Sequence, residues 1–185
     1  MLDELYERTR KRMDQSVDAV RRELAGLRTG RASTTLLDGI SVDYYGQMTP
    51  LSQVAKLSAP EPGLLVAQPF DPSLVPVIEK AIRASDLGLN PASDGKLIRI
   101  PIPPLTEERR RQMVRKVGGI AEDGRTAVRQ IRRDANEEIK AAQKDGEISE
   151  DDARRRLDEI QKLTDEHVKR IDELARAKEK ELMEF

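Results

Sequence analysis

Arginines gather along one side of a helix that the sequence predicts from a cap at Thr106 to Lys144. At about 100° per residue, the apolar residues of this stretch share one face and the basic residues lie beside it. The basic residues are Arg125, Arg129, Arg132, Arg133 and Lys140, and the acidic residues, mostly on the other flank, are Asp123, Asp134, Glu137 and Glu138. A one-sided row of guanidinium groups is what a partner lined with phosphates requires.

Two other interpretations compete with phosphate binding. A charged helix face is often only solvated and carries ion pairs within the helix. A structural or adaptor coiled-coil protein could also use such arginines to bind an acidic protein. Arginine dominates over lysine in this row, and its planar fork suits phosphate better than a point charge does, which favours nucleic acid. The chain has no aromatic stacking platform, so we expect any RNA to be recognised through its backbone and shape.

The sequence offers little for catalysis. His167 is the single histidine and lies near the apolar seam of a predicted helix, which favours a structural role. No cysteine, phosphate-binding loop or isolated pair of carboxylates is present. Residues 145–152 resemble half of a calcium loop, but its first and third ligand positions fall on Ala141 and Gln143, so a capped turn is favoured. We expect no enzyme, cofactor or metal; a hydrolase with a hidden carboxylate pair is the rival.

Composition limits the class of protein without deciding its partner. Charged residues make up 36% of the 185 residues, yet the formal net charge is only −1, so only the distribution of charge is informative. The lack of cysteine fits a reducing cytosol. The N-terminus is charged from its third residue, unlike a signal peptide, and no apolar run approaches the roughly 20 residues of a membrane span. We therefore expect a cytoplasmic protein with no membrane partner.

Charge and periodicity divide the chain into three parts. Residues 32–105 hold 5 Lys/Arg and 7 Asp/Glu, whereas about half of the residues outside this segment are charged. Apolar residues recur every three or four positions in the flanks, which predicts three long helices that pack together, at 2–27, 106–144 and 149–182. The pattern of apolar residues and turns in residues 32–105 predicts a small α/β unit. Its strands are expected near 40–45, 54–57, 64–69 and 97–100, and its helix at 74–82.

We therefore expect a helical domain at 1–30 and 106–185, with a small domain inserted at 31–105. Two connecting segments join these domains. The first contains Thr29, Gly30 and Arg31, and the second consists of residues 101–105. Glycine frees the backbone of one connection and prolines stiffen the other. Such a double connection favours a hinge or swivel over free tumbling.

The sequence closely resembles the bacterial ribosome recycling factor family from end to end, in a series of matching stretches that follow in the same order. They lie at residues 27–33, 36–40, 44–46, 79–82, 85–91, 104–110, 125–136, 145–152 and 180–185. The resemblance implies an α+β fold with L-shaped two-domain architecture, a long three-helix bundle joined flexibly to the inserted small α/β domain.

The resemblance also implies a translation factor that acts after peptide release. With elongation factor G, and GTP hydrolysis by that partner, the factor would split the ribosomal subunits and release mRNA and deacylated tRNA. The bundle would lie on the 50S subunit and contact its 23S rRNA, and the factor would be a monomer.

Carried onto matching positions, the resemblance makes Arg132 the principal rRNA contact, supported by Arg129 and Arg133. Arg125 belongs to the same row. Further contacts would come from Arg28, Arg31 and Arg110, and the hinge would consist of Thr29, Gly30, Arg31, Pro103, Pro104 and Leu105. Gly118 and Gly119 are unusual for this helix, so no RNA contact is carried over to position 118.

Overall fold

The computed structural model describes residues 1–27 and 29–184. Within them the chain forms two compact units, one of residues 1–27 with 107–184 and the other of residues 29–106. None of the described helices is long and apolar enough to cross a membrane.

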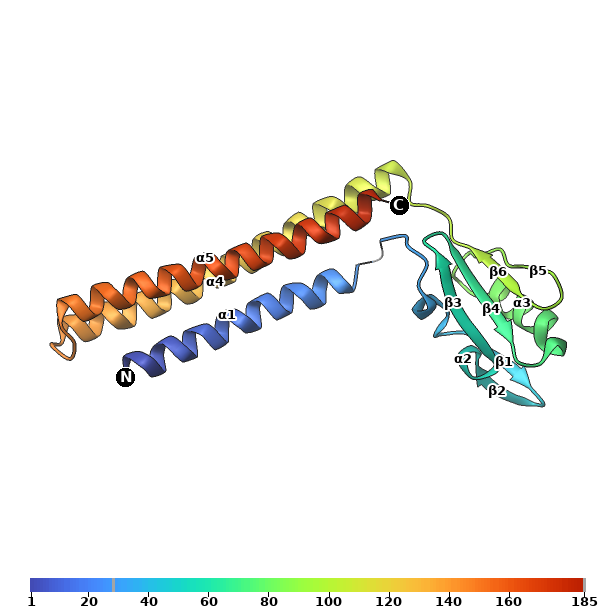
Figure 1. Cartoon of the computed structure of the whole chain (residues 1–185), viewed down its shortest axis with the longest axis horizontal. Coiled ribbons are helices and arrows are strands. Elements are labelled where there is room, and N and C mark those ends of the chain that lie inside the picture. Colours follow the sequence, from blue (N-terminus) through green and yellow to red (C-terminus); the bar gives the residue numbers. More distant parts are fainter. Residues whose placement is uncertain (28, 185) are drawn as a thin grey trace. The chain divides into compact units, whose positions relative to one another are not determined.

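Three long helices make up the first unit as far as it is described: α1 (Leu2–Ala25), α4 (Glu107–Lys144) and α5 (Glu150–Met183). They run side by side in Figure 1 and each packs against the other two. Ion pairs give their directions. Arg8 and Arg12 of α1 bind Glu138 and Asp134 of α4, so these helices are antiparallel, whereas α1 and α5 are parallel. The predicted bundle and the α+β fold class are confirmed.

A capped turn joins α4 to α5. Gly146 has a φ of 74°, and its N–H donates to the carbonyl of Gln143 (3.1 Å) while the Glu147 N–H donates to that of Ala142 (2.9 Å). This pattern closes the C-terminus of a helix. The side chain of Ser149 then accepts a hydrogen bond from the Asp152 N–H (3.1 Å) and begins α5. Residues 145–152 therefore form the capped turn that the sequence favoured over a calcium loop.

The three helices approach one another closely at Gly124. A Cβ atom added to Gly124 would overlap Cγ2 of Val20 in α1 and lie 3.3 Å from Cδ1 of Ile171 in α5. Val20, Ile171 and the neighbouring Val128 are buried. The missing side chain therefore lets two bulky residues from different helices pack against the α4 backbone.

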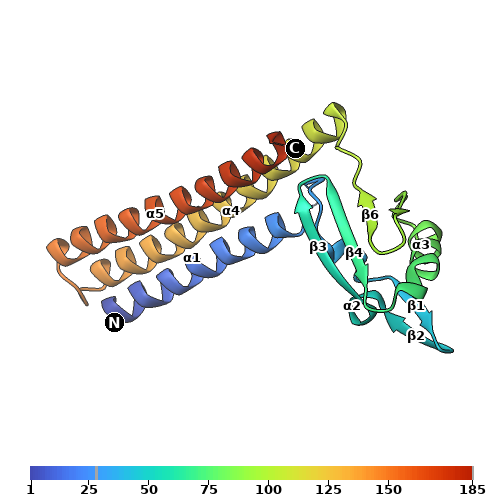
Figure 2. The ribbon, with the colours of Figure 1, turned by 45° about the vertical axis from the view of Figure 1, so that its right-hand side comes forward.

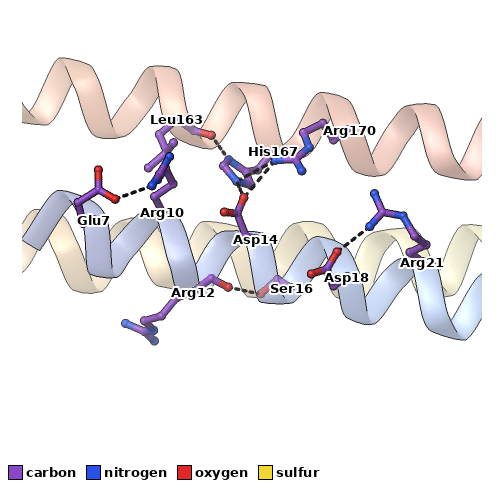
Figure 3. A network of polar contacts seen from close by, with 10 residues as sticks. All are labelled: Glu7, Arg10, Arg12, Asp14, Ser16, Asp18, Arg21, Leu163, His167 and Arg170. Carbon is purple, nitrogen blue, oxygen red and sulfur yellow. Dashed lines mark hydrogen bonds and ion pairs between the residues drawn. The ribbon is translucent and has the colours of Figure 1, made fainter.

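A polar network fastens α5 to α1 beside this apolar seam (Figure 3). His167 is 2% exposed, and its Nδ1 lies 2.7 Å from the carbonyl of Leu163, one turn back. Its Nε2 lies 2.7 Å from Oδ1 of Asp14 on α1, which also accepts a hydrogen bond from Arg170 (3.1 Å). These contacts give the single histidine the structural position that the sequence favoured.

The second unit has its own core. A two-stranded sheet pairs β1 (Ser41–Tyr44) with β2 (Gln47–Pro50), and a four-stranded sheet has the order β3-β4-β6-β5, all antiparallel within the described residues. The bounds are β3 Ala55–Glu61, β4 Leu64–Pro69, β5 Ala92–Ser93 and β6 Ile98–Pro101. Short helical segments cover Thr34–Leu37, Leu51–Val54 (α2) and Pro72–Leu74. Ile78 and Ile82 of α3 (Val75–Ala84) belong to the same core as the sheet residues Leu65 and Ile98. Figure 2 shows α3 beside the strands of this unit.

The strand predictions were partly correct. Strands β1, β4 and β6 lie within one residue of three predicted segments. The predicted strand at 54–57 begins one residue late, because Val54 ends the helical turn α2, and it extends to Glu61. Strands β2 and β5 were missed, because they are only four and two residues long and contain no buried residue, and they pair only once β1 and β6 are in place.

Replacing Gly124 with alanine is expected to destabilise the bundle. Overpacking costs about 1–3 kcal/mol, which should outweigh the gain of about 1 kcal/mol in helix propensity. The matched control is Gly119→Ala on the same helix, where an added Cβ meets nothing within 4 Å and the free energy of unfolding should rise by about 1 kcal/mol. Denaturant unfolding followed by circular dichroism measures both, and equal gains for the two variants would contradict the close approach.

Replacing Asp14 with asparagine should change the acid stability of the protein. The hydrogen bond from His167 holds the pKa of Asp14 below its usual value of 3.8; burial opposes this and Arg170 reinforces it. Charged Asp14 therefore stabilises the fold above about pH 4, and this contribution is lost as the pH falls through the lower folded-state pKa. The thermal midpoint of Asp14→Asn should lie below that of the wild type near neutral pH, and the gap should narrow below about pH 4. A gap that stays constant down to acid pH would contradict this assignment.

Candidate nucleic-acid interface

Four arginines form what we call the basic edge: Arg125, Arg129, Arg132 and Arg133 of α4. Contacts place this edge beside α5, because Arg125 binds Asp172 and Arg132 binds Gln161, both on α5. The α1 side of α4 is different. There Asp134 and Glu138 pair with Arg12 and Arg8 of α1. The predicted separation of charge on α4 therefore has a structural cause, since its acidic residues on this side neutralise α1.

Arg125 is the most constrained member of the basic edge. Its side chain is 23% exposed, and it pairs with Asp172 across the helix interface and with Glu122 one turn back (2.9 Å). Burial lowers the pKa of Arg125, but hydrogen bonds to Glu122 and Asp172 outweigh burial and the pKa is raised. Two carboxylates already neutralise this guanidinium, so its main effect is to hold α4 against α5.

Arg129 is held more loosely. Its Nη1 lies 3.5 Å from Oε1 of Glu122, and its side chain is 43% exposed. Ion pairs of this exposure contribute about 0–1 kcal/mol to stability. A phosphate group with stronger, charge-assisted hydrogen bonds can therefore compete for Arg129.

Arg132 and Arg133 carry charge that no carboxylate of residues 1–27 and 29–184 neutralises. Arg132 Nη1 donates to Oε1 of Gln161 (3.4 Å), and Nε2 of Gln161 donates to Asp165 (2.9 Å). A neutral amide thus orients Arg132 without cancelling its charge. Arg133 is exposed and has no hydrogen-bond or ion-pair partner among the described residues. Within the basic edge, these two guanidinium groups are the ones most available to an anionic ligand.

The other predicted rRNA contacts do not lie on the basic edge. Arg110 is half-buried in the first turn of α4, more than three turns before Arg125. Arg31 is exposed and belongs to the second unit. Arg28 lies outside the described residues.

The predicted hinge residues lie in two connections that carry no helix or strand in their described parts. In the first, Thr29 is buried and Gly30 has a φ of 78°, a left-handed conformation that favours glycine. In the second, Pro103 and Pro104 are exposed and Leu105 is half-buried.

Backbone hydrogen bonds mark where each connection joins the small unit. The Ala32 N–H donates to the carbonyl of Pro62 (2.6 Å), and the Ile102 N–H donates to that of Gly63 (2.8 Å). Pro62 and Gly63 form the turn between β3 and β4. Both connections are therefore fixed to one turn, and the segments outside these bonds are only a few residues long.

Three polar residues of the interface were not predicted. Glu122 carried a usable signal, because residues three and seven positions apart share a helix face and it precedes Arg125 and Arg129 by these spacings. Gln161 gave no such signal in the sequence, because its contact with Arg132 depends on the register of α5 against α4. Asn136, one turn beyond Arg132, has a buried Oδ1 without a hydrogen-bond partner in the described structure.

Comparison with known proteins identifies relatives over the whole chain. Residues 20–183 match the family model for ribosome recycling factor. Proteins called ribosome-recycling factor from Desulfatibacillum aliphaticivorans and Halalkalibacterium halodurans are 52% and 54% identical over 185 and 184 residues, and each match covers 100% of both chains.

Solved structures agree with these relatives. A solution structure of the ribosome recycling factor has a TM-score of 0.66 and 45% identity, covering 100% of this chain and 98% of that one. A second match comes from models of the T. thermophilus ribosome recycling factor and the E. coli elongation factor G bound to the E. coli post-termination complex. It has a TM-score of 0.60 and 49% identity and covers 98% of each chain.

Proposed function

This chain belongs to the ribosome recycling factor family, and from this premise we propose that it disassembles the post-termination ribosome together with elongation factor G. GTP hydrolysis by that partner accompanies splitting of the subunits and release of mRNA and deacylated tRNA. This chain makes and breaks no bond itself. The T. thermophilus relative bound with elongation factor G to a post-termination complex supports this proposal.

The observation that carries the proposal is the uncompensated charge of the basic edge. Arg132 and Arg133 lie on a helix that is fixed on both sides, and within the described structure neither faces a carboxylate. The guanidinium group of Arg132 is oriented by Gln161, so it loses little conformational freedom when it binds phosphate. We assign 23S rRNA of the 50S subunit as their ligand, with Arg129 as a supporting contact and Arg125 acting mainly through its hold on α5. Arg28, Arg31 and Arg110 are proposed as further contacts.

The hinge completes the proposed mechanism. The bundle anchors the protein on the large subunit while the small unit meets elongation factor G. The motion is assigned to residues 29–31 and 103–105, because Ala32 and Ile102 are already bonded to the β3–β4 turn. A push on the small unit then reaches the bundle through these short connections.

An adaptor that binds acidic proteins is the rival function. The ion pairs of Arg125 with Glu122 and Asp172 are the kind of contact it would use. That protein would sediment with its partners after ribonuclease treatment and would show no preference for large subunits.

Replacing Arg132 with alanine should weaken binding to large ribosomal subunits by about 1–3 kcal/mol, the cost of a lost charge-assisted hydrogen bond. Helix content should not change, because Gln161 is the only described partner that Arg132 loses. Cosedimentation with purified 50S subunits measures the affinity. The wild-type log affinity should also fall with log salt, by roughly 0.7–0.9 per phosphate contact.

Lys11→Ala is the matched control for Arg132→Ala. It removes the same charge from an exposed position on α1 that has no partner in the described residues. Equal affinities for the two folded variants would refute a specific contact at Arg132.

Locking the hinge should separate binding from splitting. The chain has no cysteine, so one cysteine introduced into each unit forms a single defined disulfide. The oxidised protein should still bind 50S subunits, because its basic edge is intact, but it should split post-termination complexes much more slowly with elongation factor G and GTP. Reduction should restore splitting, as followed by light scattering. Full splitting by the oxidised form would exclude a mobile hinge.

A further inference from the structure

Glu122 occupies a special place among the carboxylates of α4. Its two oxygens bind different arginines of the basic edge: Oε2 lies 2.9 Å from Arg125 and Oε1 lies 3.5 Å from Arg129. It is the carboxylate that faces Arg129 within the described part of the chain. Glu122 thus neutralises an edge whose other half, Arg132 and Arg133, stays uncompensated.

The two arginines are held unequally. Arg125 is 23% exposed and also pairs with Asp172, whereas Arg129 is 43% exposed and pairs with Glu122 alone among the described residues. Arg129 can therefore turn away without leaving Glu122 unpaired, since Arg125 remains beside it. Arg125 is fixed by the second carboxylate in either case.

We propose that Glu122 is an internal counterion that occupies Arg129 in the free protein, and that an RNA phosphate replaces it on Arg129 when the bundle binds. This inference rests on the proposed binding of rRNA by the basic edge. Phosphate displaces Glu122 because its oxygens accept strong hydrogen bonds from the guanidinium group of Arg129. The exposed ion pair between Arg129 and Glu122, at 3.5 Å, is weak by comparison.

The exchange has a consequence for affinity. Part of the attraction between Arg129 and phosphate is used to break the Glu122 contact, so Glu122 weakens binding without abolishing it. Arg132, oriented by the neutral Gln161, carries no such cost. Glu122 therefore sets how tightly the bundle holds RNA, and Arg132 supplies the principal contact.

Replacing Glu122 with glutamine tests the exchange in the full-length protein, with purified 50S subunits as the probe. Removing the carboxylate should tighten binding about two- to fivefold, the range expected for an exposed ion pair. The matched control is Glu137→Gln, the same charge change on the same helix at an exposed residue with no ion pair in the described structure. It should tighten binding less. Glu122→Ala, checked like the others for its thermal midpoint, should match Glu122→Gln.

A double variant identifies the arginine through which Glu122 acts. In an Arg129→Ala background, Glu122→Gln should lose most of its gain, because Arg125, the other guanidinium that Glu122 contacts, stays paired with Asp172. The converse change, Gln161→Glu, places a carboxylate beside Arg132 and should weaken binding. Equal gains for Glu122→Gln and Glu137→Gln, or a gain that persists without Arg129, would overturn the counterion role while leaving rRNA binding intact. If Arg132→Ala and Arg129→Ala both bind like the wild type, the proposed function and this inference fail together.

Discussion

The close packing of α4 against α5 is the constraint on which the basic edge depends. Gly124 lets Ile171 approach the backbone of α4, and the next residue of each helix, Arg125 and Asp172, forms an ion pair. An apolar contact and a polar contact at consecutive positions fix both the distance and the register of the two helices. Two turns further along α4, that register brings Arg132 beside Gln161. A one-residue slip would rotate a different side chain toward Arg132.

Charge on α4 is sorted according to its neighbours. On the side toward α1, carboxylates of α4 meet arginines of α1, as in the pair Arg12–Asp134. On the side toward α5, the arginines belong to α4. Arg125 and Arg129 pair with carboxylates there, whereas Arg132 and Arg133 do not within the described residues. This sorting explains why a chain with a net charge of −1 can still present an uncompensated basic edge. Surface charge that is paired locally contributes little to long-range attraction, so the unpaired residues determine the field that a phosphate encounters.

Local sequence patterns predicted the elements better than their contacts. The long helices were predictable because an apolar repeat over many turns has one interpretation, and strand β4 because it is an apolar run between turns. A structural position near the apolar seam was predicted for His167, but the buried Thr164 escaped prediction as a core residue. Its hydroxyl donates a hydrogen bond to the carbonyl of Ile160 one turn back, so a polar residue can be buried there. The row of arginines was visible, but their unequal neutralisation was not. It depends on residues such as Asp172 and Gln161, which approach α4 only after the bundle has formed.

The two connections to the small unit are physically different, and this difference bears on the proposed hinge. Gly30 adopts a left-handed φ of 78°, which most residues avoid, so the first connection depends on glycine to turn there. Pro103 and Pro104 have fixed φ angles and no N–H to bond, so the second can rotate mainly about ψ. Both join the small unit at the turn holding Pro62 and Gly63. Rotation about either connection must therefore be matched by the other, which reduces many conceivable motions of a tethered unit to a few coupled ones. In the proposed mechanism, this coupling would give a partner's push a defined direction.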